Sequence, residues 1–164
     1  MLKFPFFLFT AILLLLSSPV KAETFIINPF VKGSFAEIKR QHQNKPFVLI
    51  FWSETCAYCM KELSMFGKLS KQYPGIDLVT VATDPFLQEA TVKDVLSRSQ
   101  LHLRQAWVFA ERFPERLYAE INKRWRGELP ATHFFTRNNQ EIPHMGMIRE
   151  AELIKWMSEQ SSLN

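Results

Sequence analysis

Residues 47–59 read Phe47-Val48-Leu49-Ile50-Phe51-Trp52-Ser53-Glu54-Thr55-Cys56-Ala57-Tyr58-Cys59 and contain both cysteines of the chain. The apolar first half, rich in aromatic and branched side chains, is typical of a buried strand that stops at a polar turn. After the turn, Leu63, Phe66 and Leu69 recur at helical spacing. The pattern predicts a strand over 47–52 followed by a helix that begins at the cysteines.

Two cysteines separated by two residues at the start of a helix suit dithiol–disulfide exchange. The first sulfur would lie at the helix N-terminus, where unsatisfied N–H groups and the positive end of the helix dipole favour a thiolate over a thiol. The second sulfur would lie one turn further on, close enough to attack a mixed disulfide formed by the first. The spacing therefore indicates an attacking thiol and a nearby resolving thiol.

The first 22 residues have the three parts of a secretory signal. Lys3 gives a positive start, an apolar run extends over residues 4–16, and residues 17–22 end in small side chains. The run is shorter than the roughly 20 residues of a membrane-spanning helix. We therefore expect cleavage after Ala22, with an uncleaved N-terminal membrane anchor as the alternative. Either way the domain is exported to an oxidising compartment, where a structural disulfide would also be expected.

Length and charge point to one domain that does not bind nucleic acid. The remaining part of the chain, residues 23–164, is long enough to bury a sizeable core. Its formal net charge falls from +4 to +2, because the leader carries Lys3 and Lys21 and no acids. Proteins that track phosphates usually carry clustered basic faces, so this weak excess argues against a nucleic-acid partner.

The rest of the chain alternates between strand and helix patterns. Ser34 is predicted to cap a helix over 34–43, since Glu37 follows at capping-box spacing. Helices are also expected from the cysteines to about residue 73, through Val92, from Pro114, and over 150–160. Further strands are expected at 25–27, 76–82, 107–109 and 132–136, the last pairing as a hairpin with 141–147. This alternation implies an α/β domain, with a central mixed sheet and helices on both faces.

Two segments carry a resemblance to a known family. Phe51-Trp52-Ser53-Glu54-Thr55-Cys56-Ala57-Tyr58-Cys59, followed by Lys61-Glu62-Leu63, resembles the active site of a thioredoxin-fold protein. Gly127-Glu128-Leu129-Pro130-Ala131-Thr132 resembles the cis-proline loop of that fold. The residues between them, about 83–124, resemble a strand–helix insertion. With the export signal, the chain is similar to the TlpA/ResA-type periplasmic thiol–disulfide oxidoreductases over essentially all of residues 23–164.

The resemblance implies a role for several residues and no cofactor. Cys56 would be the nucleophile and Cys59 the resolving thiol. Pro130, in the cis conformation, would lie beside the disulfide, and Leu129 would offer its backbone N–H and C=O to an incoming peptide. Trp52 would pack beside the redox pair. The implied partners are disulfide-containing client proteins and a membrane thiol electron donor in the periplasm, with reduction as the favoured direction.

The sequence departs from the family in three places. Thioredoxin has a buried acid where this chain has Ile50, and no glutamate lies between the cysteines. We therefore predict that Glu54 or Glu128 helps to deprotonate Cys59, although ordinary surface acids are the simpler interpretation. The proline that usually kinks the active-site helix is replaced by Ser64, which puts the shape of the helix in doubt.

Three other interpretations of the cysteine pair stay open. It could be a structural disulfide, but a loop of two residues constrains the unfolded chain little. It could oxidise clients if its potential were higher. It could also hold zinc or copper in a metal-delivery module, with His133 or His144 as the further ligand, because a closed zinc site needs four ligands. Ordinary positions in the fold are favoured for both histidines, so no metal site is predicted.

Overall fold

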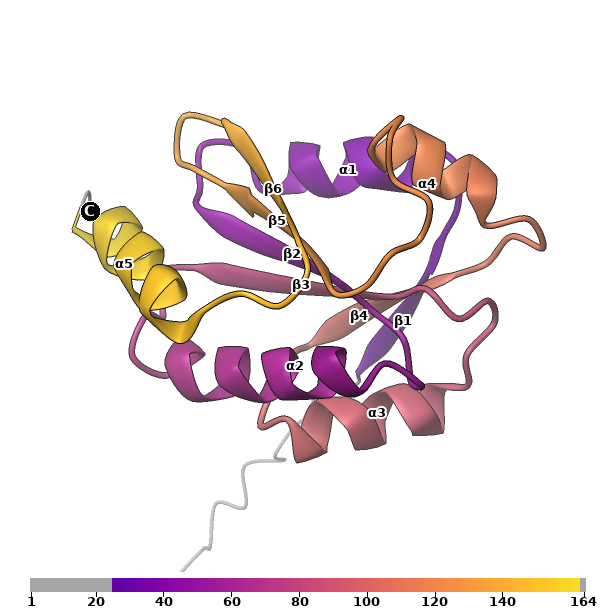
Figure 1. The fold of residues 1–164 in the computed structure, drawn as a ribbon, viewed down its shortest axis with the longest axis horizontal. Coiled ribbons are helices and arrows are strands. Elements are labelled where there is room, and N and C mark those ends of the chain that lie inside the picture. The colour runs from indigo at the N-terminus through magenta and orange to yellow at the C-terminus, as the bar shows by residue number, and fades with distance from the viewer. Residues whose placement is uncertain (1–24, 163–164) are drawn as a thin grey trace, which may run out of the picture.

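Strand β2 (Phe47–Trp52) lies at the centre of the sheet in the computed structural model, which describes residues 25–162. It pairs with β3 (Asp77–Ala82) on one side and with β5 (Ala131–Phe135) on the other. With β1 (Ile26–Phe30), β4 (Gln105–Phe109) and β6 (Glu141–Met145), these strands form a six-stranded sheet of order β1-β4-β3-β2-β5-β6 (Figure 1). All residues of β2 are buried, as expected for a strand covered on both faces.

The strands run in a mixed pattern that decides where the cysteines lie. Strands β1 to β4 are parallel to their neighbours, whereas β5 is antiparallel to β2 and β6 is antiparallel to β5. The carboxyl ends of β1 to β4 therefore meet at one edge of the sheet, which we call the carboxyl edge. The helix that carries the cysteines begins at this edge, directly after β2 (Figure 1).

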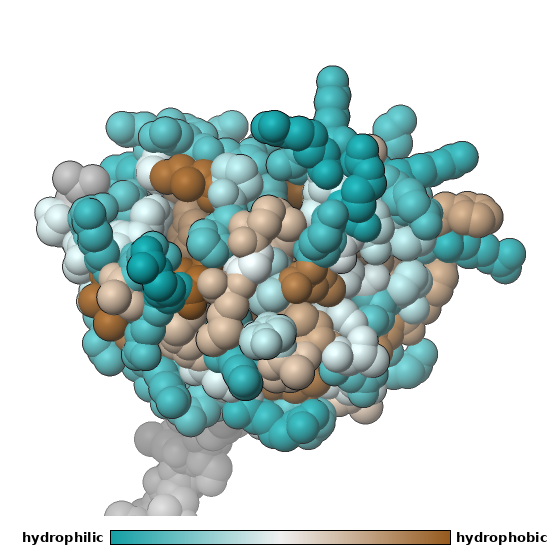
Figure 2. Space-filling view, in the orientation of Figure 1, coloured by the Kyte–Doolittle hydropathy of each residue, from teal (hydrophilic) through white to brown (hydrophobic). Residues whose placement is uncertain are grey.

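Helices cover both faces of the sheet, as the alternation predicted. Helices α1 (Ser34–Gln41) and α4 (Glu115–Ile121) lie on one face (Figure 1). Helices α2 (Ala57–Ser70), α3 (Glu89–Arg98) and α5 (Glu150–Ser161) pack on the other. Each face has its own apolar cluster, and the side of the molecule seen in Figure 2 is largely hydrophilic, with separate hydrophobic patches. The α/β class and the mixed sheet are thereby confirmed.

The predicted cap of the first helix is wrong. Gly33 is the N-cap residue, with φ 94°, and Ser34 is already helical. The Ser34 hydroxyl accepts a hydrogen bond from the Val31 N–H (2.9 Å) instead of from the first turn of its own helix. Glu37 pairs with Arg40 and Gln41 on the helix surface, so no capping box forms. The left-handed backbone conformation at the N-cap position is one that glycine adopts readily. Because Gly33 holds that position, Ser34 is the first helical residue and cannot cap the helix.

Other boundaries differ from the prediction by a few residues. Strand β1 extends to Phe30, α2 ends at Ser70, and β6 ends at Met145, where Gly146 adopts φ 85°. The predicted insertion over 83–124 contains α3, β4 and α4, and β4 separates β3 from β1 in the sheet.

The predicted leader, residues 1–22, lies outside the described residues. Within residues 25–162, no helix is both long enough and apolar enough for a membrane span.

Candidate active site

The two cysteines form a disulfide at the start of α2. Cys56 is the N-cap residue in extended conformation, and its Sγ accepts a hydrogen bond from the N–H of Cys59 (3.1 Å). The S–S distance is 2.12 Å and the two Cα atoms lie 5.2 Å apart. Cys56 is half-buried, whereas Cys59 is only 1% exposed. The first sulfur can therefore be approached from solvent, and the second lies behind it in the core.

Asp84, directly after β3, holds the turn that precedes the cysteines. Its carboxylate accepts hydrogen bonds from the Ser53 hydroxyl (2.8 Å) and from the Glu54 N–H (2.7 Å). The Ser53 carbonyl in turn accepts from the Cys56 N–H (3.1 Å). Nothing in the sequence indicated this role for Asp84, because pairing between adjacent parallel strands cannot be read from either segment alone.

Leu129 and Pro130 lie at the same edge as the cysteines. The peptide bond between them is cis, as the resemblance implied. The register of β5 against β2 pairs Ala131 with Phe51, so the two preceding residues extend alongside Trp52 and Ser53. Pro130 is buried, and Leu129 packs against the same apolar cluster as Cys56. Trp52 is fully buried in that cluster together with Cys59.

Glu62 is a buried acid one turn after Cys59, and the sequence analysis gave it no role. Its carboxylate accepts a hydrogen bond from the Thr132 hydroxyl (2.7 Å) and another from the Ile148 N–H (3.0 Å). The side chain is 0% exposed, and burial raises the pKa of Glu62 despite these two hydrogen bonds. Residues three apart on a helix lie on the same side of it, with their Cβ atoms about 5–6 Å from each other, so Glu62 and Cys59 share the buried face of α2. Its position on the apolar stripe of Cys59, Leu63 and Phe66 is the signal that could have identified it.

The two acids chosen from the sequence lie on the surface. The carboxylate of Glu128 accepts from the Arg126 N–H (2.8 Å), and this hydrogen bond lowers the pKa of Glu128. Glu54 is exposed, and its contact with Asp84 is made by its backbone. Neither side chain is drawn into the core as Glu62 is, so their roles at Cys59 stay predictions.

The two histidines considered as metal ligands, His133 and His144, lie on different faces of the sheet. His133 is buried on the α1 face, where it contacts Phe35 and pairs with Glu141 (2.8 Å). His144 lies opposite Thr132 in the β5–β6 register, on the face that carries Glu62. In the part of the chain that the structure describes, no three His, Cys, Asp or Glu side chains gather as a metal site would require.

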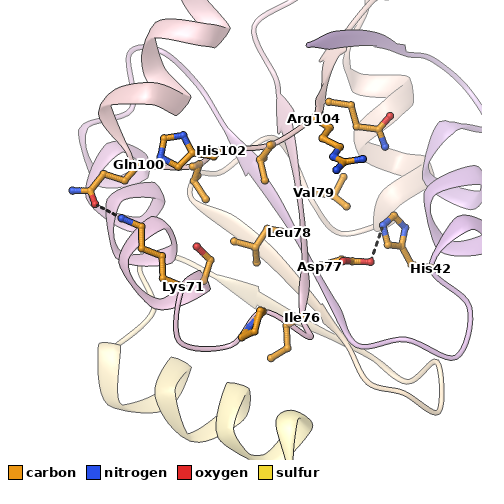
Figure 3. Close-up of a pocket in the computed structure, with 14 residues that line it drawn as sticks. His42, Lys71, Ile76, Asp77, Leu78, Val79, Gln100, His102 and Arg104 are labelled. Atoms are coloured by element: carbon orange, nitrogen blue, oxygen red, sulfur yellow. Dashed lines mark hydrogen bonds and ion pairs between the residues drawn. The ribbon is translucent and has the colours of Figure 1, made fainter. Parts of the chain in front are cut away.

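A cavity of about 460 Å³ lies away from the cysteines, near the starts of β3 and β4 (Figure 3). Between these strands, pairing in residues 25–162 is confined to Val81 with Trp107 and Ala82 with Val108, so the strands diverge toward their amino ends. His42 and Asp77, which are among the residues that line the cavity, approach each other to 3.8 Å between Nε2 and a carboxylate oxygen. The cavity occupies the edge of the sheet opposite to the carboxyl edge and does not belong to the cysteine site.

Comparison with known proteins identifies the fold. No protein-family model matches the sequence. A thioredoxin-like protein of Haemophilus influenzae is 32% identical over 99 residues, which cover 59% of this chain and 58% of that protein. The chain thus matches less than two thirds of the length of this relative.

Solved structures give the same result over a larger part of the chain. A secreted disulfide oxidoreductase of Mycobacterium tuberculosis, described as homologous to DsbE, superposes with a TM-score of 0.59 at 20% identity, over 73% of this chain and 85% of the other. A thiol:disulfide interchange protein of Chlorobium tepidum gives 0.59 at 16% identity, over 74% and 83%. StoA of Bacillus subtilis gives 0.52 at 20%, over 70% and 83%. The sheet, the disulfide at the start of α2 and the cis proline therefore belong to a protein of the thioredoxin-like fold.

Proposed function

We propose that this protein is a thiol–disulfide oxidoreductase that reduces disulfides in exported client proteins. One observation carries the proposal: Cys56 caps α2 and receives an N–H hydrogen bond at its sulfur, while Cys59 lies buried one turn behind it. In the reduced protein, the same N–H and the helix dipole favour the thiolate of Cys56, which is the nucleophilic form. A purely structural disulfide requires neither this placement nor the difference in exposure.

The reaction follows from these positions. The Cys56 thiolate attacks one sulfur of the client disulfide, so that a Cys56–client bond forms and the client S–S bond breaks. The released client thiolate takes up a proton. Cys59, once deprotonated, attacks the Cys56 sulfur and expels the second client thiolate, which is protonated in turn. The client gains two electrons and two protons, and the cysteine pair ends as the disulfide observed in the structure.

In this proposal Glu62 accepts the proton that Cys59 must lose. Buried acids with raised pKa values are suited to exchange protons near neutral pH. Its burial and its raised pKa favour this role over the exposed Glu54 and Glu128. The proposal therefore assigns the second step of the exchange to the Cys59–Glu62 pair.

The setting of the reaction belongs to the same proposal. Export to the periplasm is supported by the predicted leader and by the likeness to a secreted protein. A reductase in an oxidising compartment needs a supply of electrons, for which a membrane thiol donor is proposed. An uncleaved leader would tether the domain to the inner membrane, next to such a donor.

Reduction of insulin disulfides by the mature domain tests the proposal. With a dithiol donor, we expect activity that is lost in Cys56→Ser, and a mixed disulfide that accumulates in Cys59→Ser because the resolving thiol is absent. Glu159→Gln, which removes an exposed charge on α5, is the control and should leave the activity unchanged. Stoichiometric copper or zinc binding without exchange activity would instead indicate the metal-delivery module.

The reduction potential of the cysteine pair decides the direction. A potential of about −270 mV supports a reductase, and a potential of about −120 mV supports an oxidant. Equilibration with glutathione of known redox ratio, followed by mass spectrometry of alkylated protein, gives this potential directly.

A further inference from the structure

Phe86 occupies a turn position that ordinarily belongs to glycine or asparagine. Residues 84–87 form a turn in which the Leu87 N–H donates to the Asp84 carbonyl (3.3 Å), with Pro85 at the second position. Phe86, at the third position, has φ 61°. A turn with proline second and positive φ third is of type II, which favours glycine or asparagine there. A bulky residue in this region is a true outlier.

The backbone around Phe86 is firmly held, so the conformation is not that of a loose loop. Its N–H donates to the Phe109 carbonyl (2.8 Å) at the end of β4. On one side Asp84 binds the turn before the cysteines, and on the other Leu87 packs against the core. These contacts fix the left-handed conformation, yet none of them requires an aromatic side chain at position 86.

The ring of Phe86 is directed to solvent instead of to the core. It is 56% exposed, so burial does not compensate for the strain of its backbone. Three aromatic rings in the described residues are more than half exposed, namely those of Tyr58, Phe86 and Phe113, and all three lie at the carboxyl edge. A strained backbone that presents an exposed ring points to function, because folding alone would favour a smaller residue.

A chain of backbone and side-chain contacts links Phe86 to the turn before the attacking sulfur. It is two residues from Asp84, a span of at most about 7 Å between Cα atoms. Asp84 binds Ser53 and Glu54, and the Ser53 carbonyl binds the N–H of Cys56. A peptide whose disulfide reaches Cys56 would therefore bring its neighbouring side chains to the turn that carries Phe86.

We propose that Phe86 is a specificity-determining residue, which binds an aromatic or large aliphatic side chain of the client next to its disulfide. The inference rests on the proposed function and adds the class of client: extended segments with an apolar side chain near the cysteine. The partner ring would pack edge-to-face or offset on the Phe86 ring, and such pairs contribute beyond the area they bury. A segment of a client that is not fully folded offers such side chains, whereas a folded surface rarely does.

Binding of short peptides to the oxidised protein tests this without any exchange reaction. The peptides carry serine in place of the client cysteine, and phenylalanine or serine at each neighbouring position in turn. By NMR titration, we expect the best phenylalanine peptide to bind about tenfold more tightly than the all-serine peptide. This preference should disappear in Phe86→Asn and in Phe86→Gly, and persist in Phe113→Asn, the matched control for loss of an exposed ring.

Thermal unfolding of the same variants separates this role from a structural one. Asparagine and glycine suit the positive φ, so both variants should melt at or above the wild-type temperature. A clear fall in melting temperature, a preference that survives both substitutions, or no preference in the wild type would overturn the inference. Insulin reduction by the wild type is measured in parallel. Its absence would remove the proposed function, while the peptide titration still decides whether Phe86 forms a binding surface.

Discussion

Glu62 links pH to the stability of the fold. Its folded pKa lies above the ordinary value of 4.5, because burial disfavours the charged form. The folded state therefore binds this proton more tightly than the unfolded state does. The resulting stabilisation is fully present below about pH 4.5 and is lost as the pH rises through the raised folded value. Above that raised value the ionised carboxylate lowers the stability of the fold, in spite of its two hydrogen bonds.

Glu62→Gln should keep the fold and slow the second step of the exchange. Glutamine can accept from the Ile148 N–H and donate to the Thr132 hydroxyl, so both contacts survive. The stability of the wild type should fall relative to that of the variant as the pH rises from about 4 to about 7.5, because only the wild type loses the bound proton. Urea unfolding at both pH values measures this difference. If Glu62 is the proton acceptor of Cys59, as proposed, release of the mixed disulfide should slow about tenfold or more.

Glu54→Gln serves as the control for this experiment, because it removes an exposed acid from the same region. It should leave the pH dependence of stability and the rate of release unchanged. If Glu62→Gln released the client as fast as the wild type, or if Glu54→Gln slowed release instead, the proton would leave Cys59 by another route.

Residues that act through neighbours in sequence were predictable, and those that act through distant partners were not. The role of Cys56 follows from a strand, a turn and a helix that are contiguous in the chain. The apolar stripe of α2 could have indicated that Glu62 is buried, but the groups that bind its carboxylate, Thr132 and Ile148, lie 70 and 86 positions away. The positive φ of Phe86 could not be predicted, because this turn type prefers glycine or asparagine at that position and the sequence has phenylalanine there.

At the scale of elements, α2 approaches the end of α3 through Gly67. A Cβ built at this position would lie 1.9 Å from the backbone carbonyl oxygen of Ser99. Figure 1 shows α2 and α3 side by side under the sheet. The glycine therefore permits the contact between the two helices that fixes α2, and with it the cysteines at its start. The serine that replaces the usual kink proline, Ser64, donates to the Met60 carbonyl (2.9 Å).

Gly67→Ala should destabilise the protein although alanine is the better helix former. The gain in helix propensity is about 1 kcal/mol. The clash of the added methyl group with the backbone of Ser99 costs more free energy than this gain. We expect a net loss of about 2 kcal/mol in the free energy of unfolding, measured by urea denaturation.

Lys68→Ala, at the next and exposed position of α2, is the control and should change stability by less than about 0.5 kcal/mol. Equal stabilities of Gly67→Ala and the wild type would mean that the α2–α3 contact adjusts freely.

The elements themselves were largely predictable, and their ends less so. β2 has the predicted bounds because a polar turn follows its apolar run directly. The start of α1 was placed correctly but its cap was not, since a serine at position 34 and a glycine at position 33 both suit a helix start. Which of them caps depends on the backbone angles of the preceding turn, and these are set by contacts outside the helix.

At the scale of the whole molecule, the junction of β3 and β4 is the least extensively paired boundary within the described sheet. The β2–β3 register runs from Phe47 with Asp77 to Trp52 with Ala82, whereas β3 and β4 pair only near Trp107 and Val108. The cavity of about 460 Å³ lies where these strands separate. The sequence predicted a mixed sheet but not this order of strands, because parallel neighbours are brought together by crossovers and not by turns.

Hydrogen exchange should reveal two regions of different stability. Amides of β2 and β5, which lie inside the sheet, should exchange only by global unfolding. Amides of β4 near Gln105 and those of β1 should exchange through a smaller opening at the β3–β4 junction. Native-state exchange in increasing denaturant, followed by NMR, distinguishes the two classes. A common opening free energy for β1, β4 and β2 would show that the sheet opens as one unit.

The carboxylate of Glu62 is satisfied by residues that are synthesised late. A chain that grows from its N-terminus presents the cysteine helix long before Thr132 and Ile148 follow. During that interval, docking the helix would bury a carboxylate without partners, which is costly. The two thiols would then stay accessible until the last quarter of the chain closes over the helix, so the C-terminal residues determine when the cysteine site is completed.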